Sequence, residues 1–100
     1  LAYLSQGGQG CISVTANVSP KLCADMQNYW MEKKFDLAMD INLKLAKLHY
    51  ALFVESSPGP VKYAAELLNL CSSQTRLPLA PIKSSTKNLV KDCLTELELI

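Results

Sequence analysis

Hydrophobic residues recur every three or four positions along most of the chain, which is the spacing of amphipathic helices. The longest such pattern predicts a helix from about Lys34 to Phe53. A shorter pattern predicts a helix at about 20–31, where Ser19 followed by Pro20 is a typical helix start. The apolar faces consist of Leu22, Met26, Tyr29 and Trp30 in the shorter helix and of Phe35, Ala38, Ile41, Leu45, Leu48 and Leu52 in the longer one.

Two further helices are predicted in the second half of the chain. The prolines of SSPGP, at 56–60, must interrupt the long helix because proline disfavours helical geometry before it. A third helix then runs from Pro60 to about Leu70, and SST at 84–86 begins a final one. The prolines of RLPLAPI, at 76–82, indicate an extended loop between them. We expect the long and final helices to pack together, because no strands are left to cover their apolar faces.

The first 31 residues follow a different pattern. LAYLSQ resembles the last turn of a helix closed by Gly7, and β-branched CISVT predicts one short strand at about 11–15. A lone strand leaves its backbone N–H and C=O groups unpaired, so its partners must lie in other sequence. We therefore interpret residues 1–31 as the last unit of a parallel α/β structure, cut from a larger protein, and 32–100 as an added helical region.

Composition narrows the class of protein. One hundred residues with 49% apolar content suit one small domain or part of one. Ten basic and nine acidic side chains give a formal net charge of +1, and the basic ones are scattered, so no nucleic-acid surface is expected. No apolar run reaches the roughly 18 residues of a membrane span, and no signal peptide is recognisable. We expect no membrane association and a cytoplasmic location.

The metal-ligating residue types do not form a recognisable site. Cys11, Cys23, Cys71 and Cys93 are far apart and include no C-x-x-C pair. We expect free thiols, buried or half-buried, with a secreted bundle containing two disulfides as the alternative. His49 is the only histidine and has no second ligand at suitable spacing, so no metal and no cofactor is predicted.

Three ordered segments carry a resemblance to a known family. GGQGCISVTANVSP at 7–20, LHYALFVESSPGPVKYAAELLNL at 48–70 and TRLPLAPI at 75–82 resemble the C-terminal part of the dihydrodipicolinate synthase family. The resemblance extends from Leu1 to Ile100. It implies a (β/α)₈ barrel followed by a helical C-terminal region, and such a barrel needs about 250 residues. The chain would then be a mainly helical piece of that structure, and its strand would be the eighth.

The resemblance also implies an activity for a longer parent protein. The family consists of class I, Schiff-base lyases of the diaminopimelate pathway of lysine biosynthesis, which condense pyruvate with L-aspartate-4-semialdehyde. Its members are homo-oligomers, tetrameric in the family, and use no cofactor. The family's Schiff-base lysine and its proton-relay tyrosine and threonine would lie before Leu1. We therefore expect no catalytic residue in this chain, and the chain alone is expected to be inactive.

One position carries a binding role by the same resemblance. Ile12 matches a residue that borders the pyruvate pocket, where it would form an apolar wall. The alternative is that Ile12 is ordinary barrel-core packing, since barrel interiors are filled by branched side chains. Lys44 and Lys62 lie in predicted helices and are interpreted as solvated charges rather than nucleophiles.

Two alternative functions stay open from sequence. One alternative is another pyruvate aldolase of the same superfamily, because N-acetylneuraminate lyase-like enzymes use pyruvate with other aldehydes. The chain also departs from the family pattern in one loop: many relatives have Asn-Pro-x-Pro with an apolar residue between the prolines, where this chain has Ser57, Pro58, Gly59 and Pro60. The chain could also be a stand-alone helical module that binds partners. A strand at 11–15 distinguishes these readings, because a barrel requires it and a helical bundle does not.

Overall fold

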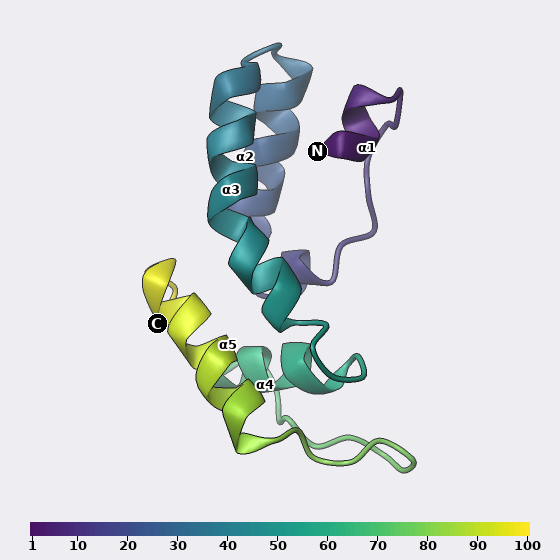
Figure 1. Ribbon diagram of the computed structural model, residues 1–100, viewed down its shortest axis with the longest axis vertical. Coiled ribbons are helices and arrows are strands. Elements are labelled where there is room, and N and C mark those ends of the chain that lie inside the picture. The colour runs from purple at the N-terminus through teal and green to yellow at the C-terminus, as the bar shows by residue number, and fades with distance from the viewer.

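The computed structural model describes residues 1–100 as helices joined by loops (Figure 1). The elements in chain order are α1 (Ala2–Ser5), the 3₁₀ helix η1 (Thr15–Asn17), α2 (Pro20–Met31), α3 (Phe35–Ala51), α4 (Gly59–Leu67) and α5 (Ser84–Glu96). The four longer helices lie where the spacing of hydrophobic residues predicts them. The mainly helical class predicted from the sequence is therefore confirmed, and α2, α3 and α4 end within three residues of their predicted ends.

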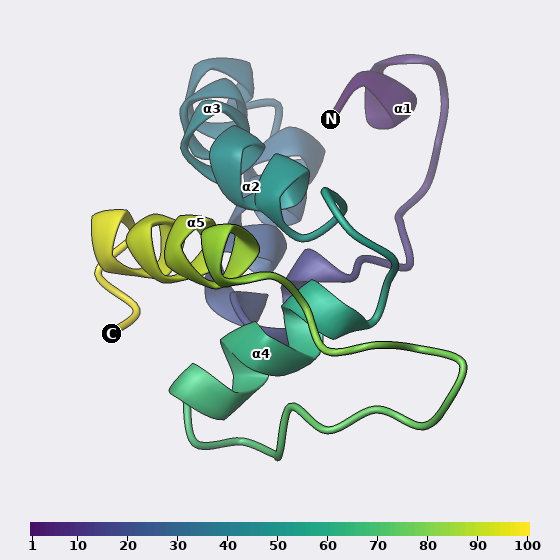
Figure 2. The same ribbon diagram turned by 60° about the horizontal axis from the view of Figure 1, so that its bottom comes forward.

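The helices form two groups that meet at one core. α2 and α3 lie side by side as an antiparallel pair, with α4 and α5 at one end of it, in both views (Figures 1 and 2). α3 reaches into both groups, because its core face also contacts α5, as predicted. The core consists of Val18, Cys23, Met26, Ala38, Ile41, Leu45, Leu48, Ala51, Leu52, Val61, Ala64, Ala65, Val90, Cys93 and Leu94.

Three helices end in the same way. Lys33, Asn69 and Glu98 follow α2, α4 and α5 with positive φ angles of 61°, 58° and 55°. In each case the next amide donates a hydrogen bond back to a carbonyl five residues earlier, as Lys34 N–H does to Tyr29 O at 2.8 Å. This left-handed ending satisfies carbonyls that the helix leaves free, and it usually selects glycine.

Two local predictions need correction. Ser19 occupies the N-cap position of α2, but its hydroxyl makes no capping bond and is buried without a hydrogen-bond partner. Phe35, assigned from sequence to the core face of the long helix, is 50% exposed. Its ring instead contacts Trp30, with ring centroids 4.7 Å apart.

The strand predicted at about 11–15 does not form in this chain. Residues 8–13 have no regular secondary structure, and Thr15, the last predicted strand residue, instead begins η1. The reason is physical, since a strand is defined by its pairing and no other segment of the chain is extended alongside this one. The predicted helix end is present as α1, and Gly7 follows it with a φ of 93°.

The cysteines differ in their environments. All four are free thiols, as expected, but only Cys23 and Cys93 are buried. Cys11 and Cys71 are exposed, so the expected burial is wrong for this pair. None of the helices combines the length and the apolar character needed to cross a membrane.

Candidate functional site

Ile12 lies in the extended segment between α1 and η1. Its side chain is fully exposed, at 107% of the reference area. Extended backbone points successive side chains to opposite sides, and here the neighbours of Ile12, the exposed Cys11 and the half-buried Ser13, lie beside residues of α2. Ile12 is therefore presented on the side of the segment that this chain leaves uncovered.

The opposite side of the segment is attached to α2. Gln27 Nε2 donates a weak hydrogen bond to Cys11 Sγ at 3.6 Å, and the Ser13 hydroxyl accepts one from the Ala16 amide at 3.3 Å. Burial raises the pKa of the nearby Cys23 thiol, while a hydrogen bond with Ser13 lowers it. Polar contacts thus fix the orientation of the segment and, through it, the direction of Ile12.

Thr15 fixes the end of the segment to α3. Its side chain is 1% exposed, and its Oγ1 lies 2.6 Å from Nδ1 of His49. Burial lowers the pKa of His49, which favours the neutral ring. His49 therefore has a structural partner 34 residues away in sequence, and no cluster of three possible metal ligands forms around it or elsewhere in the chain.

The backbone of the segment is unpaired. None of the N–H or C=O groups from Gln9 to Ser13 takes part in a backbone hydrogen bond. Between this segment, α1 and α2 lies a hollow of about 520 Å³, lined by apolar side chains such as Leu4 and Met26 together with Cys11, Ser13 and His49. A row of free backbone groups beside an apolar hollow is the surface that a further strand and its side chains would complete.

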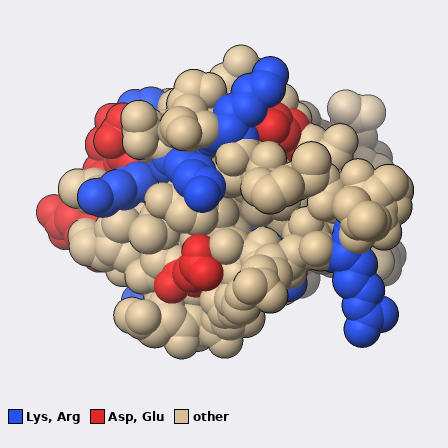
Figure 3. All heavy atoms as spheres, turned by 90° about the horizontal axis from the view of Figure 1, so that it is seen from below, with Lys and Arg blue, Asp and Glu red and all other residues tan.

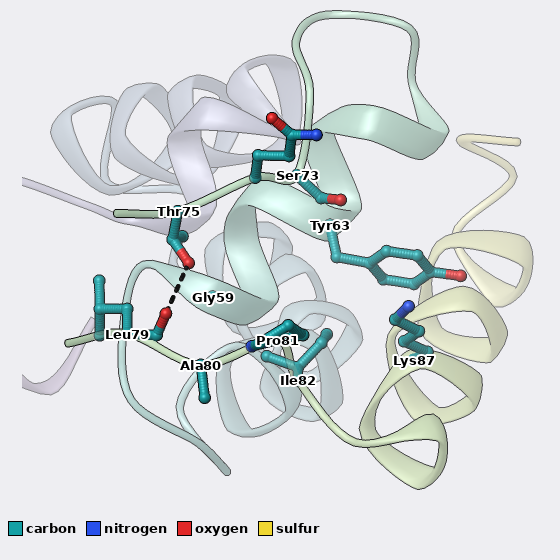
Figure 4. A pocket seen from close by; sticks show the side chains of 10 residues that line it. Gly59, Tyr63, Ser73, Thr75, Leu79, Ala80, Pro81, Ile82 and Lys87 are labelled. Atoms are coloured by element: carbon teal, nitrogen blue, oxygen red, sulfur yellow. Dashed lines mark hydrogen bonds between the residues drawn. The ribbon is translucent and has the colours of Figure 1, made fainter. Parts of the chain in front are cut away.

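A second, smaller hollow lies at the other end of the molecule, between α4, α5 and the loop that joins them (Figure 4). Its volume is about 250 Å³. The Thr75 hydroxyl donates to the Leu79 carbonyl at 3.2 Å and holds the loop, while Lys87 Nζ lies 5.4 Å from the centre of the Tyr63 ring. Its lining includes one tyrosine and one lysine, and neither a carboxylate nor a histidine.

The two lysines considered from sequence are remote from Ile12 in their contacts. Lys62 Nζ donates to the carbonyl of Gln74 at 2.5 Å, and Lys44 is exposed on α3. No lysine lines the hollow beside the extended segment. On the face seen in Figure 3, acidic and basic side chains lie among a mainly uncharged surface. The site therefore provides a positioned apolar side chain and no amine nucleophile.

Comparison with known proteins identifies the family. The sequence profile of the dihydrodipicolinate synthetase family matches residues 1–97. The chain belongs to the dihydrodipicolinate synthetase family. Among its relatives, the 4-hydroxy-tetrahydrodipicolinate synthase of Acidiphilium cryptum is 50% identical over 100 residues, which are 100% of this chain and 34% of that protein. The enzyme of the same name from Gluconacetobacter diazotrophicus is 47% identical over 95 residues, covering 95% of this chain and 32% of the relative.

Solved dihydrodipicolinate synthases share the arrangement of these helices. The structure from Thermotoga maritima aligns with a TM-score of 0.96 at 35% identity, over 99% of this chain and 34% of its own. A structure from Acinetobacter baumannii, described as a complex with pyruvate, aligns with a TM-score of 0.87 at 36% identity, over 94% of this chain and 32% of its own. The chain thus spans about a third of the length of the family members that it matches.

Proposed function

We propose that this chain is the C-terminal third of a pyruvate-dependent Schiff-base lyase. The observation that carries the proposal is the extended segment at Gln9–Ser13, whose backbone groups are all unpaired in a chain that spans a third of its relatives. In this proposal the segment pairs as the eighth strand of a (β/α)₈ barrel. Residues 1–31 then form the last β/α unit, and residues 32–100 form the helical region that follows.

The proposed reaction takes place on residues outside this chain. A lysine amine of the longer protein would condense with the carbonyl carbon of pyruvate and release water, and the resulting enamine would attack the aldehyde of L-aspartate-4-semialdehyde. Both relatives described above are named 4-hydroxy-tetrahydrodipicolinate synthase. Their shared name supports L-aspartate-4-semialdehyde as the aldehyde over the substrate of N-acetylneuraminate lyase-like enzymes. We also propose that the longer protein is a homo-oligomer and that it is located in the cytoplasm.

Ile12 has the role of an apolar wall in this proposal. Its side chain projects from the uncovered side of the segment, which is the side available to a barrel interior. Hydrogen bonds at Cys11 and Thr15 hold that orientation from behind. An apolar wall binds the methyl side of pyruvate in the ground state and the transition state alike, so Ile12 would contribute to affinity rather than to chemistry.

The proposal is tested by comparing two polypeptides. The condensation of pyruvate with L-aspartate-4-semialdehyde is measured with the 100-residue chain and with the natural polypeptide that contains it. We expect turnover by the longer polypeptide only, because a Schiff-base lyase needs an activated amine and a proton relay. Turnover by the 100-residue chain at a comparable rate would overturn the proposal, as would a folded longer polypeptide that does not react with pyruvate.

A further inference from the structure

The contact between Thr15 and His49 joins the segment that carries Ile12 to a firmly packed part of the core. His49 lies in the last turn of α3, next to Leu48 and three residues before Leu52, and both leucines are completely buried. Thr15 begins η1 and lies three residues after Ile12. At most about 10 Å of chain therefore separates Thr15 from Ile12. A side chain of the helical region thus holds the extended segment close to its proposed binding residue.

The other end of the segment has no comparable attachment. The Gly8 amide donates to the Tyr3 carbonyl at 3.0 Å, and the backbone of the next five residues makes no backbone hydrogen bond. Open space surrounds Gly10, where an added Cβ would have no atom within 4 Å. The bond from Gln27 to the sulfur of Cys11 is long, at 3.6 Å. The closest side-chain attachment of the segment is therefore the one at Thr15.

The hydrogen bond between Thr15 and His49 has one direction. Thr15 is 1% exposed, and Nδ1 of His49 is the only hydrogen-bond partner of its hydroxyl. A buried hydroxyl proton is costly without an acceptor, so the hydroxyl donates to Nδ1 and the proton of the neutral ring lies on Nε2. His49 therefore serves as an acceptor, and a replacement without an acceptor at this place breaks the contact.

We propose that Thr15 and His49 are positioning residues for Ile12, and that their hydrogen bond raises the affinity of the longer protein for pyruvate. The inference rests on the proposed lyase function, because Ile12 has its binding role only there. Strand pairing would hold residues 9–13 beside their neighbours, but the end of an element opens more easily than its centre. The contact with α3 would hold that end, so both residues act on pyruvate binding through Ile12 and need not touch the substrate.

The first experiment removes the hydroxyl in the natural polypeptide and measures steady-state kinetics with pyruvate varied. Thr15→Val should raise KM by about twofold to tenfold, the factor that corresponds to the net contribution of one hydrogen bond, and should change kcat less. Thr15→Ser keeps the hydroxyl and should restore the parent KM. The matched control is Thr75→Val, which removes a hydroxyl that donates to the Leu79 carbonyl at 3.2 Å, far from Ile12 in the chain, and should leave KM unchanged.

The same contact is then broken from the histidine side. His49→Leu removes the acceptor and should raise KM as Thr15→Val does. His49→Asn keeps a carbonyl oxygen close to the place of Nδ1 and should lie nearer to the parent. KM does not depend on the amount of active protein, so partial unfolding of a variant does not imitate the expected change. An equal rise in KM for His49→Asn and His49→Leu overturns the role of the hydrogen bond.

Combining Thr15→Val with Ile12→Ala tests whether the pair acts through Ile12. Without the Ile12 side chain no wall is left to position, so the double variant should have the KM of Ile12→Ala alone. Two effects that multiply independently overturn the inference, because a general structural role would act in either background. An unchanged KM in Thr15→Val overturns it too and leaves the lyase proposal intact. A natural polypeptide that forms no Schiff base with pyruvate overturns both.

Discussion

Thr15 Oγ1 and His49 Nδ1 lie 2.6 Å apart, and this contact joins the end of the extended segment to the middle of the molecule. Thr15 is almost completely buried, at 1% exposure. The segment carrying Ile12 has few other attachments, since the backbone of Gln9–Ser13 makes no backbone hydrogen bonds. The direction in which Ile12 points therefore depends on a histidine that lies far from it in sequence.

Stability should fall in mild acid because of His49. Burial lowers its pKa in the folded chain, so between that pKa and the ordinary value of about 6.5 the unfolded chain binds more protons. The contribution of the neutral ring is complete above about pH 6.5 and decreases as the pH falls through the lowered pKa. Urea unfolding between pH 8 and pH 5 measures this, and His49→Gln should flatten the slope. An unchanged slope in that variant would contradict the assignment to His49. Hydrogen bonds from Thr86 to Glu55 and from Ser73 to Glu66 lower the pKa of these two carboxyls, so both titrate below this pH window.

Leu48→Asp should unfold or aggregate the chain. Leu48 is completely buried in the core, and an unpaired carboxylate there loses its hydration without gaining a partner. The milder Leu48→Ala should lower the free energy of unfolding by about 2–5 kcal/mol. Circular dichroism and thermal melting provide the measurement. Leu70→Asp, at a site 64% exposed, is the control and should melt like the parent. A Leu48→Asp variant with the parent's melting temperature would disprove the core position.

Gly59→Ala should destabilise the junction between α4 and the following loop. A Cβ at position 59 would lie 2.7 Å from Cγ2 of Ile82, a methyl group attached directly to a branched carbon that cannot swing away. The overlap should cost about 1–3 kcal/mol in the free energy of unfolding. Ile82→Ala removes that methyl, so Gly59→Ala should cost much less in its presence. Equal costs in both backgrounds, measured by a double-mutant cycle, would show that the contact is not the cause.

Ile12→Ala in the natural polypeptide should raise KM for pyruvate more than it lowers kcat. In the proposed role, the Ile12 side chain would supply contacts common to the ground state and the transition state, and their loss would be a loss of uniform binding. Ile12→Val should behave almost like the parent. Steady-state kinetics with pyruvate varied provides the measurement. A large fall in kcat with KM unchanged would show that Ile12 does more than form a wall.

The helices were predictable because their information is local. The spacing of Ile41, Leu45 and Leu48 determines which face is buried, and the prolines of 56–60 separate α3 from α4. Phe35 was misassigned because α3 has two apolar faces, and spacing alone does not show which one the chain itself covers.

The site was less predictable because its contacts are long-range. No local pattern indicates that Thr15 meets His49, 34 residues away. The β-branched residues of 11–15 favour extended backbone, yet a strand also needs a neighbour. Without that neighbour the segment stays extended and unpaired, and Thr15 turns into η1. The sequence could therefore indicate that the backbone around Ile12 is extended, but it could not show whether this segment pairs with another strand.

The location of the Schiff base tests the central proposal most directly. The natural polypeptide is incubated with pyruvate and borohydride, and the modified peptide is identified by mass spectrometry. We expect one reduced pyruvyl adduct per polypeptide, on a lysine outside residues 1–100, and no adduct on the 100-residue chain treated alone. A stoichiometric adduct on Lys44, Lys62 or any other lysine within residues 1–100 would contradict the proposal that this chain shapes the pyruvate pocket while other parts of the protein perform the reaction.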